Sequence, residues 1–566
     1  MVKWYDPRQL AGTALDVLVS TLFGRHADHR LMEALACGTD DVYDYSTDEQ
    51  QRPRTEIWID YVADTGDGWN STHAVAYHCV QRRLVLEAPD GSRHDTRRGD
   101  LLIFGGDEVY PTPGRRQYEQ RLVHPYATAC RYTEPPHPRV FAVPGNHDWY
   151  DSLVSFTRLF CSKQWFGGWQ APQQRSYFAL KLPHGWWLLG TDVQLGSDVD
   201  QPQVEYFRRA AGEMQAGDRI ILCNAEPHWI YAHIYGKCDT DYSENNLAFL
   251  EDKVLGRKVS VFIAGDLHHY RRHEAQGPEG ARQKITAGGG GAFLHPTHGP
   301  DVSRLAGGFN LKASFPDPKV SRRLCWRNLL FPFLNPSFGL VPAVFYVLTA
   351  WAVMADVGWF GLHAILPALH STLRSALADP VAAFWGVATF TGFLLFTDTH
   401  SKPYRYIAGT LHGLIHLVAI FFLGWGATYL GVSVLGLEFK SISQMLLAGG
   451  LIFAGGWIAG SFIMGIYLLV SLNLYKQHCN EAFSSLAIQD WKSFLRLKID
   501  AQGALTIFPV GIRRVPRRWK QTSPRAPGPE QMPDDPAAVT PALIEPPIVL
   551  TRQAQEPGVL SQKFTE

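Results

Sequence analysis

Four long uncharged apolar runs between residues 338 and 475 restrict this chain more than any other feature. They are Phe338–Ala355, Val381–Thr397, Tyr406–Leu437 and Ser441–Tyr475. About 20 apolar residues cross the hydrocarbon core of a bilayer, so the first two runs are just long enough and the last two exceed the requirement. A soluble core does not explain four such runs in so short a stretch. The sequence therefore predicts a transmembrane region of about four helices.

The basic residues around these runs predict their orientation. Lys402 and Arg405 follow the second run and Lys476 follows the fourth, whereas the two outer loops hold only Arg374 and Lys440. Lysine and arginine are in excess on the cytoplasmic side of membrane proteins. We therefore expect a multi-pass protein of the cell's inner (plasma) membrane, with both ends of the region in the cytoplasm. The opening residues show no signal-peptide pattern, which agrees with this orientation.

Composition excludes several other classes of protein. The 566 residues are too many for one ordinary domain. Lys+Arg and Asp+Glu both number 53, so no nucleic-acid partner is expected. Eight cysteines without CxxC pairs argue against a disulfide scaffold or a zinc ribbon.

Short apolar runs in the first 300 residues, most followed by glycine or a polar cluster, predict strands. They are Ile57–Ala63, Leu101–Phe104, Val140–Val143, Trp186–Gly190, Ile220–Cys223 and Val259–Ala264. Segments such as Gln203–Met214 and Asn246–Leu255 are long enough for crossover helices. Strands that alternate with helical segments predict a layered α/β domain.

These patterns divide the chain into five parts. They are an N-terminal helical lead-in (1–55), the α/β domain (56–318), the transmembrane region (319–476), a small basic cytoplasmic module (477–521) and a disordered proline-rich tail (522–566). Helical periodicity covers residues 7–36 of the lead-in. A hairpin of Ser493–Ile499 and Ala504–Val510 is expected in the module. Low hydrophobicity and many prolines favour disorder in the tail.

Two features of the membrane runs leave alternatives open. Gly456 and Gly460 allow close helix packing, either within the chain or in a homodimer. His412 and His416 lie one helical turn apart, and ionisable groups at such depth often serve function. Because their run holds no acidic residue, we expect hydrogen bonds between helices instead.

The predicted strands of the α/β domain end in residues that can hold metal ions. Asp64 and Asp107 follow the first two strands, and Asp266 and His268 follow the last. The carboxyl ends of parallel strands meet at one edge of a sheet. Two metal ions about 3.5–4 Å apart at such an edge can clamp a phosphate and lower the pKa of a bound water. The pattern predicts a two-metal site for phosphate chemistry.

In combination, these motifs resemble the calcineurin-like metallophosphoesterases over roughly residues 56–300. That family has an early Asp, then GD, GNH[DE], a single His and GHxH. This chain has, in the same order, Asp64, Gly106-Asp107, Gly145-Asn-His-Asp148 and Gly265-Asp-Leu-His268. The glycine of Asp64-x-Gly66, Tyr110 and Arg272 are similar to the purple acid phosphatase branch. With the membrane runs, the motifs also resemble a group of bacterial membrane-attached metallophosphoesterases. The resemblance implies a domain with αββα layers.

The resemblance also implies ligands for two divalent or trivalent metal ions. Asp107 would bridge the ions, while Asp64 and His268 would hold the first. Tyr110 would be a further ligand of that ion or would only pack beside Pro111. Asn146 would hold the second ion.

Catalytic roles follow from the same motifs. His147 would protonate the leaving group or stabilise the equatorial oxygens, and Asp148 would orient His147.

The run Gly288–Gly291 lacks the lysine of a P-loop. We expect its backbone to approach the metal rim closely.

Two positions depart from the family pattern. Asp266 replaces the first histidine of GHxH, and a carboxylate favours harder ions such as Mn, Mg or Fe over Zn. The single-histidine motif falls on Asn224, with Glu226 and His228 nearby. The sequence leaves open which of these three completes the second metal site.

The sequence thus predicts a membrane-anchored phosphoesterase that attacks phosphate mono- or diesters with a metal-bridged hydroxide. Its substrate would be a lipid-linked or a soluble phosphate. The alternative is a degenerate membrane sensor that binds a metal or a phosphorylated ligand without turnover. A transporter or channel with a regulatory domain is a third class, and the nearly uncharged membrane runs argue against it.

Overall fold

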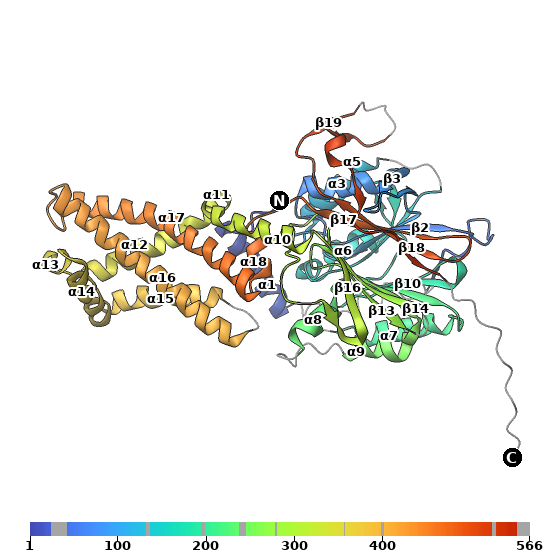
Figure 1. Ribbon diagram of the computed structural model, residues 1–566, viewed down its shortest axis with the longest axis horizontal. Helices are drawn as coiled ribbons and strands as arrows, with labels where there is room; N and C mark the ends of the chain where they lie inside the picture. Colours follow the sequence, from blue (N-terminus) through green and yellow to red (C-terminus); the bar gives the residue numbers. More distant parts are fainter. Residues whose placement is uncertain are drawn as a thin grey trace, which may run out of the picture.

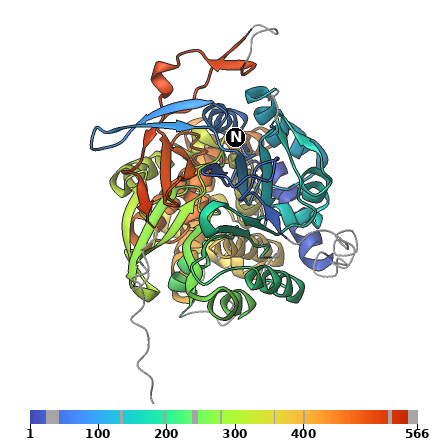
Figure 2. The same cartoon turned by 90° about the vertical axis from the view of Figure 1, so that its right-hand side faces the viewer.

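The computed structural model describes residues 1–23, 42–131, 136–193, 198–236, 245–277, 280–355, 357–397, 401–522 and 528–551. Figure 1 shows two parts, an α/β domain on the right and an elongated bundle of helices on the left. The amino-terminal residues lie near the junction of the two parts. Figure 2 views the molecule from the α/β end, with the helices behind.

Two sheets form the centre of the α/β domain. The first runs β1-β9-β10-β11-β12-β14-β13-β16-β15, and the second runs β21-β18-β17-β2-β5-β6-β8-β7 with β22 paired to β18. The strands of the first sheet are β1 (Tyr43–Asp44), β9 (Phe178–Lys181), β10 (Trp186–Gly190), β11 (Arg219–Cys223), β12 (Val259–Ala264), β13 (Tyr270–Gly277), β14 (Gly280–Ala287), β15 (Arg304–Leu305) and β16 (Phe309–Phe315). Those of the second include β2 (Ile57–Val62), β5 (Leu101–Gly105), β6 (Arg139–Val143), β7 (Trp165–Phe166) and β8 (Trp169–Gln170). All six strands expected from the apolar runs are present.

Strand β2 shows why its sequence is apolar throughout. Ile59 and Tyr61 lie in the core between the two sheets, whereas Trp58 and Val62 lie in a second core beneath helices. Successive side chains of a strand point to opposite faces. A strand that is buried on both faces therefore lacks the alternation of a half-exposed one.

Helices cover the outer face of each sheet. The second sheet packs on α3 (Trp69–Cys79), α5 (His124–Ala129) and α6 (Val154–Phe160), through residues such as Val75, Tyr126 and Phe156. The first sheet packs on α7 (Gln201–Gly212), α8 (His228–Tyr235) and η5 (Leu250–Leu255). The layers run helix, sheet, sheet, helix, so the expected α/β layering is confirmed.

The hairpin after the membrane region belongs to the second sheet. It forms as expected, from β17 (Lys492–Ile499) and β18 (Leu505–Ile512). However, β17 pairs antiparallel with β2, and Arg496 of β17 meets Asp60 of β2 at 2.7 Å with both side chains buried. The prediction that residues 477–521 form a separate module is therefore wrong. Both faces of the hairpin are covered, since Leu495 and Leu497 lie in the core between the sheets and Phe494 lies in the core beneath the helices.

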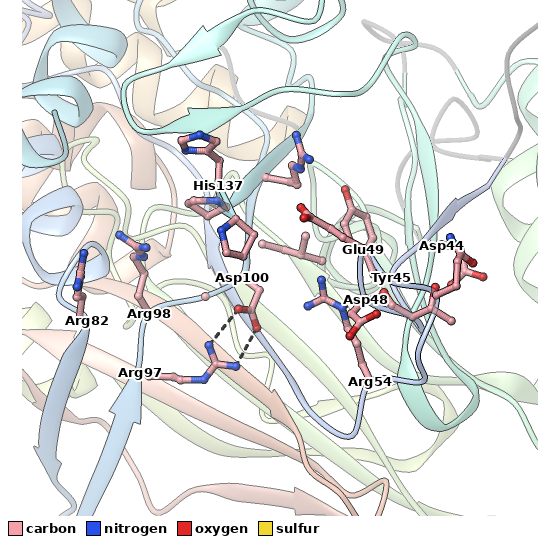
Figure 3. A pocket seen from close by; sticks show the side chains of 17 residues that line it. Asp44, Tyr45, Asp48, Glu49, Arg54, Arg82, Arg97, Arg98, Asp100 and His137 are labelled. Atoms are coloured by element: carbon pink, nitrogen blue, oxygen red, sulfur yellow. Dashed lines mark hydrogen bonds and ion pairs between the residues drawn. The ribbon is translucent and has the colours of Figure 1, made fainter. Parts of the chain in front are cut away.

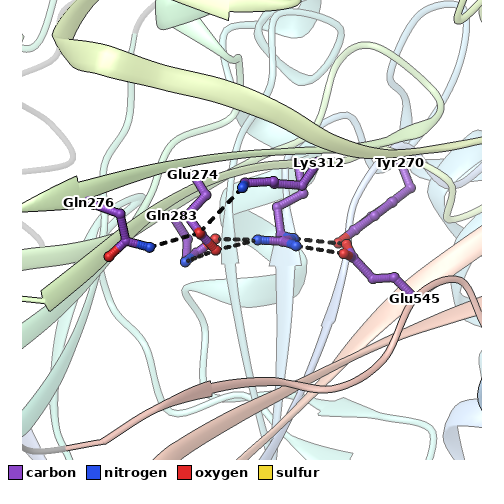
Figure 4. Close-up of polar contacts among 7 residues, drawn as sticks. Tyr270, Glu274, Gln276, Gln283, Lys312 and Glu545 are labelled. Carbon is purple, nitrogen blue, oxygen red and sulfur yellow. Dashed lines mark hydrogen bonds and ion pairs between the residues drawn. The ribbon is translucent and has the colours of Figure 1, made fainter.

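The segment that follows is also part of the fold. Short strands β21 (Ala542–Leu543) and β22 (Ile548–Leu550) pair with β18, and β20 (Gln531–Pro533) pairs with β19 (Trp519–Gln521). Glu545 accepts hydrogen bonds from Arg272 (2.7 and 2.9 Å) and from the Tyr270 hydroxyl (2.6 Å), as Figure 4 shows. Disorder was thus wrongly predicted for residues 528–551, because this segment pairs with β18 and buries Leu543, Ile548 and Leu550. Residues 523–527 and 552–566 lie outside the described residues.

At the amino end, helix α1 (Pro7–Phe23) confirms the helical periodicity as far as residue 23. The rest of the expected helix, to residue 36, falls outside the described residues.

The bundle consists of long apolar helices. They are α12 (Leu340–Ala355), α14 (Ile365–Ala378), α15 (Pro380–Phe396), α16 (Lys402–Tyr429) and α17 (Ile442–Tyr475). Among the described residues, three segments, Pro336–Met354, Lys402–Val434 and Ile442–Tyr475, are long and apolar enough to cross a membrane. Helices α14 and α15 meet at 101° and make a fourth crossing if the bent pair is one span.

Polar contacts inside the bundle join its helices. The Tyr346 hydroxyl of α12 lies 2.7 Å from Nδ1 of His416 on α16, and His416 Nε2 lies 3.2 Å from His412 Nε2. Hydrogen bonding between helices at these histidines is therefore confirmed. A Cβ added at Gly456 or Gly460 would lie within 3 Å of Tyr346 or Pro342. These glycines thus allow α17 to approach α12 within the chain.

A shared apolar cluster fixes the α/β domain to the bundle. It contains Phe293, Leu294 and Ile488 of the domain, Phe331 and Phe338 of the connection, and Met464, Leu468 and Leu472 of α17. Tyr5 lies in the same cluster and its hydroxyl donates to the Glu481 carbonyl at 3.0 Å.

Candidate metal centre

Three carboxylates leave the ends of three strands through sharp backbone turns. Asp64 follows β2, Asp107 follows β5 and Asp266 follows β12, with φ values of 58°, 54° and 66°. Aspartate is among the residues that tolerate this left-handed conformation best. Backbone bonds hold the turns together, since Asp64 N–H donates to the Gly106 carbonyl at 3.0 Å. The turns bring the three side chains to one edge of the domain.

The tightest cluster at this edge gathers four of the expected site residues. The Tyr110 hydroxyl lies 2.8 Å from His268 Nε2, 2.9 Å from Asp107 Oδ2 and 3.2 Å from Asp64 Oδ1. All four side chains are buried. His268 Nδ1 lies 2.8 Å from the Phe293 carbonyl, which leaves Nε2 directed at the cluster. Tyr110 thus contacts the proposed ligands directly.

The donor set of this cluster fits a metal cation. Asp64 Oδ2 is buried without a hydrogen-bond partner among the described residues. Burial raises the pKa of the Asp64 carboxyl well above its ordinary value and raises that of Asp107 to about 7. A cation would offset the cost of burying these negative charges together. Oxygen-rich sites favour hard ions.

Glycines leave the space that the carboxylates occupy. A Cβ at Gly288 would lie 1.9 Å from Asp64 Oδ2, and one at Gly145 would lie 2.1 Å from Asp107 Oδ1. The backbone of the glycine run therefore approaches the candidate ligands closely, as the sequence predicts.

A preformed cage is not present in this arrangement. Across the described ranges, no three His, Cys, Asp or Glu side chains are grouped as metal ligands. The Tyr110 hydroxyl lies between Asp64, Asp107 and His268. An ion that binds here therefore needs the hydroxyl as a ligand or displaces it.

The loop after β6 presents His147 to the same edge. Its backbone N–H donates to Asp107 Oδ1 at 2.9 Å, and its ring Nδ1 lies 2.6 Å from the Pro111 carbonyl. The carbonyl therefore orients the ring and leaves Nε2 free of that contact. Asn146 is exposed, and its amide donates to the Tyr150 hydroxyl at 3.3 Å.

Asp148 contacts both loops at this edge. Its carboxylate accepts from the backbone N–H of Gly145 (2.9 Å) and Glu108 (3.2 Å) and from the Tyr118 hydroxyl (2.5 Å). It thus ties the loop after β6 to the loop after β5. The Pro111 carbonyl is the group that contacts the His147 ring at Nδ1, so an orienting role of Asp148 stays a prediction.

The three candidates for the second metal site have different surroundings. Asn224 Oδ1 accepts from the Thr191 hydroxyl at 2.6 Å, and its Nδ2 lies 3.1 Å from His228 Nδ1. The other ring nitrogen of His228 lies 3.0 Å from Glu251 Oε1. Asn224 and His228 are therefore engaged with each other and with neighbours away from the carboxylate cluster.

Glu226 lies on the side of Asp266. The Tyr231 hydroxyl donates to Asp266 Oδ2, and burial, Asp266 and then Glu226 raise the pKa of Tyr231. Asp266 N–H in turn donates to Asp64 Oδ1 at 3.0 Å. Of the three candidates, Glu226 is thus the one whose charge acts on the carboxylate side of the site.

Sequence reasoning missed Lys492, which comes from β17. Its side chain is buried and donates to the Ala292 carbonyl at 2.5 Å. Burial lowers its pKa to about 8, and Asp67 and Asp64 are among the charges that oppose this shift. Local sequence gives no signal for it, because its place depends on the pairing of β17 with β2.

Trp4 is a second residue that was missed. Its ring lies 6.1 Å from the Tyr110 ring, 6.2 Å from His147 and 5.4 Å from Phe293, measured between centroids. Asp67 holds this segment because its carboxylate accepts from Val2 N–H at 3.0 Å.

A separate cleft lies at the opposite ends of β5 and β6. It has a volume of 380 Å³ and includes Leu101 and Arg139, where these strands begin. Figure 3 shows Arg97 paired with Asp100, at 3.0 Å, beside Arg82 and Arg98. None of the expected site residues lines this cleft.

The domain that carries this candidate centre is similar to a known family. Residues 57–270 match the sequence profile of the calcineurin-like phosphoesterases. The chain therefore carries a calcineurin-like phosphoesterase domain, as its motifs predict.

Two solved structures are similar to the chain. GAP50, the anchor in the inner membrane complex of Plasmodium, is 12% identical, with 46% of this chain and 84% of that chain covered and a TM-score of 0.30. PhoD is 11% identical, with 42% of this chain and 58% of that chain covered and a TM-score of 0.26. No curated protein sequence matches the chain.

Proposed function

We propose that this protein is a membrane-anchored, metal-dependent phosphoesterase. The observation that carries the proposal is the buried cluster of Asp64, Asp107, Tyr110 and His268 at the strand ends of a calcineurin-like phosphoesterase domain. The unpartnered Asp64 Oδ2 and the raised carboxylate pKa values support a cation at this point.

The ligands divide between two ions that share Asp107. Asp64, Tyr110 and His268 would hold the first. Asn146, Glu226 and Asp266 would hold the second. When bound, such ions neutralise phosphate oxygens and lower the pKa of water.

The other residues bind and position the substrate. His147, whose Nδ1 is held by the Pro111 carbonyl, has Nε2 available to protonate the leaving oxygen. Asp148 accepts hydrogen bonds from the backbone of both the His147 loop and the Asp107 loop and so holds the two loops together. Lys492 adds a positive charge beside His268.

The shared sheet supports four membrane crossings. Residues of β2 and β17 are paired, although one strand precedes the long helices and the other follows them. Both strands therefore lie on the same side of any membrane that these helices cross. An odd number of crossings is incompatible with this pairing. If all three long spans cross the membrane, the α14–α15 pair would make the fourth crossing, and positive-inside loops favour a cytoplasmic domain.

The test compares wild type with Asp107→Asn in purified full-length protein. Each protein is stripped of metal, reloaded with Mn, Fe, Zn or Mg, and assayed on a chromogenic phosphomonoester and phosphodiester. We expect metal-restored hydrolysis in wild type and none in Asp107→Asn, with similar melting temperatures. The control is Asp95→Asn, an exposed carboxylate paired with Arg83. Equal hydrolysis by wild type and Asp107→Asn would refute the two-metal model.

A non-catalytic sensor is the second candidate. The full engagement of Asn224 by Thr191 and His228 favours it, because one family ligand is then missing. Metal stoichiometry distinguishes the two functions. Two bound ions per chain support catalysis, and one ion without hydrolysis supports the sensor.

A further inference from the structure

A cavity of 340 Å³ adjoins the candidate metal centre. Asp266 and Tyr231, which share a hydrogen bond, form part of its wall. The opposite wall consists of residues 476–481, which directly follow α17. The cavity therefore connects the reactive edge of the α/β domain with the end of a membrane helix.

The polar wall of this cavity holds hydrogen-bonding atoms that find no partner within the described residues: the Nε–H donor of Arg271, and the His269 ring, which when neutral donates from one nitrogen and accepts at the other. His269 is 2% exposed and Arg271 is 5% exposed. Arg271 Nη2 donates to the Thr297 carbonyl at 3.1 Å, and no ion pair of Arg271 occurs within the described ranges. A buried cation with unpaired donors is costly. An anionic ligand with several oxygens would offset this cost.

Another part of the wall is apolar. Ile230 and Ile234 come from α8, and Leu267, Pro296 and Pro300 come from the loops after β12 and β14. The cavity thus combines a side suited to an anion with an apolar side. Such a lining suits an amphipathic ligand better than a fully polar one.

The cavity lies beside the ends of three helices of the bundle, α15, α16 and α17. His478 lines it and stacks on Phe396, the last residue of α15, with centroids 5.7 Å apart and planes at 8°. The Tyr467 hydroxyl of α17 lies 2.9 Å from His478 Nε2, and Tyr404 in the first turn of α16 donates to Ser471 at 2.6 Å. At 1.5 Å per residue, the 34 residues of α17 extend about 50 Å, beyond the roughly 30 Å apolar core of a bilayer. Its final turns therefore reach the head-group level or beyond.

We infer that the substrate is a phosphate ester of a membrane lipid, whose head group enters this cavity beside the ends of α15–α17 and presents its phosphate to Asp266. The inference rests on the proposed function. In the reaction, water forms the new bond to phosphorus and the bond between phosphorus and the lipid alcohol oxygen breaks. His147 delivers the proton that this oxygen takes up.

The experiment uses the full-length chain in phosphatidylcholine vesicles that contain 10 mol% dioleoylphosphatidic acid or phosphatidylglycerol. Glycerol 3-phosphate and glycerophosphoglycerol are the soluble counterparts, and p-nitrophenyl phosphate reports basal hydrolysis. We expect kcat/KM for one of the two lipids to exceed that of its soluble counterpart at least about a hundredfold, or 2.7 kcal/mol. Equal values for lipid and soluble esters would overturn the lipid inference while leaving the phosphoesterase intact.

Two variants test whether the preference for lipid esters over soluble esters depends on the cavity. Ile234→Trp narrows the apolar wall and should lower the lipid-to-soluble ratio of kcat/KM about tenfold. Its matched control is Ala232→Trp, which is exposed on the same helix and does not line the cavity. An unchanged ratio in Ile234→Trp would contradict the assignment.

Binding gives a readout that does not depend on hydrolysis. We expect native mass spectrometry of the detergent-purified protein to retain dioleoylphosphatidic acid or phosphatidylglycerol on wild type, and several times less on His269→Ala. If no substrate is hydrolysed but this difference remains, the proposed enzyme fails and the lipid site stands as a receptor site. If neither lipid is retained preferentially over phosphatidylcholine, the lipid site is refuted.

Discussion

Two buried tyrosine–histidine hydrogen bonds of nearly equal length lie in the two halves of this molecule. Tyr110 and His268 are 2.8 Å apart in the α/β domain, and Tyr346 and His416 are 2.7 Å apart in the bundle. Their surroundings differ. The first pair touches Asp64 and Asp107, whereas the second lies beside His412 and Phe393, which stacks on His416 at 3.4 Å.

The comparison shows what marks a site for chemistry. Burial of polar groups occurs in both halves, and in the bundle it connects helices. In the α/β domain the same hydrogen bond lies beside several buried carboxylates, and Asp64 Oδ2 finds no hydrogen-bond partner in the part of the chain that the structure describes. Clustered buried carboxylates predict a ligand, whereas a neutral hydrogen-bonded pair needs none.

The largest effect is expected from crowding the charged cluster. Gly288→Ala would place Cβ 1.9 Å from Asp64 Oδ2 and 2.8 Å from the backbone nitrogen of His268. Displacing a ligand by about 1 Å should lower kcat/KM on the order of 100-fold. Metal-dependent hydrolysis and metal content after dialysis measure this. Wild-type values for both would show that Asp64 holds no ion.

A smaller effect is expected from removing the hydroxyl at the centre of the cluster. Tyr110→Phe deletes the group that contacts Asp64, Asp107 and His268. We expect metal affinity to fall about 10- to 100-fold, as for groups that support metal ligands. Equilibrium dialysis against Mn measures it. An unchanged affinity would indicate that the hydroxyl moves aside when the ion binds.

The matched change in the bundle should affect only stability. Tyr346→Phe removes the same kind of group from His416. We expect a loss of about 1 kcal/mol, typical of one hydrogen bond, with metal affinity and kcat/KM unchanged. Thermal unfolding in detergent and the chromogenic assay test both parts. A fall in kcat/KM beyond twofold would show that the bundle is coupled to the site.

The smallest effect is expected at an open position of the bundle. Apart from its own helix backbone, no atom of the described residues lies within 4 Å of a Cβ added at Gly450. Gly450→Ala should leave kcat/KM unchanged and should alter stability by no more than about 1 kcal/mol. Thermal unfolding in detergent measures the change in stability, and the chromogenic assay measures kcat/KM. A large destabilisation would reveal a contact with a second copy of the chain or another partner.

The sequence predicted the candidate site residues well where their position depends on nearby residues in the chain. Apolar runs that end in Asp64, Asp107 and Asp266 predict strands with carboxylates at one edge, and in the structure these three side chains leave the ends of β2, β5 and β12. It was uninformative where a residue's place depends on a distant partner. Lys492 reaches the site only because β17 pairs with β2. Likewise, the structure was needed to show that the Asp148 carboxylate accepts from the backbone of Glu108.

The pairing of β17 with β2 has a consequence for synthesis of the chain. Asp60 and Arg496, which meet across these strands, are 436 residues apart in sequence. At translation rates of 5–20 residues per second, β2 waits roughly 20 to 90 s before its neighbour is made. During this time one edge of β2 is open, and the long helices must leave the ribosome first. Unpaired edges invite aggregation. We therefore expect the nascent chain to depend on chaperones at this stage, and truncation before β17 to leave the α/β domain insoluble.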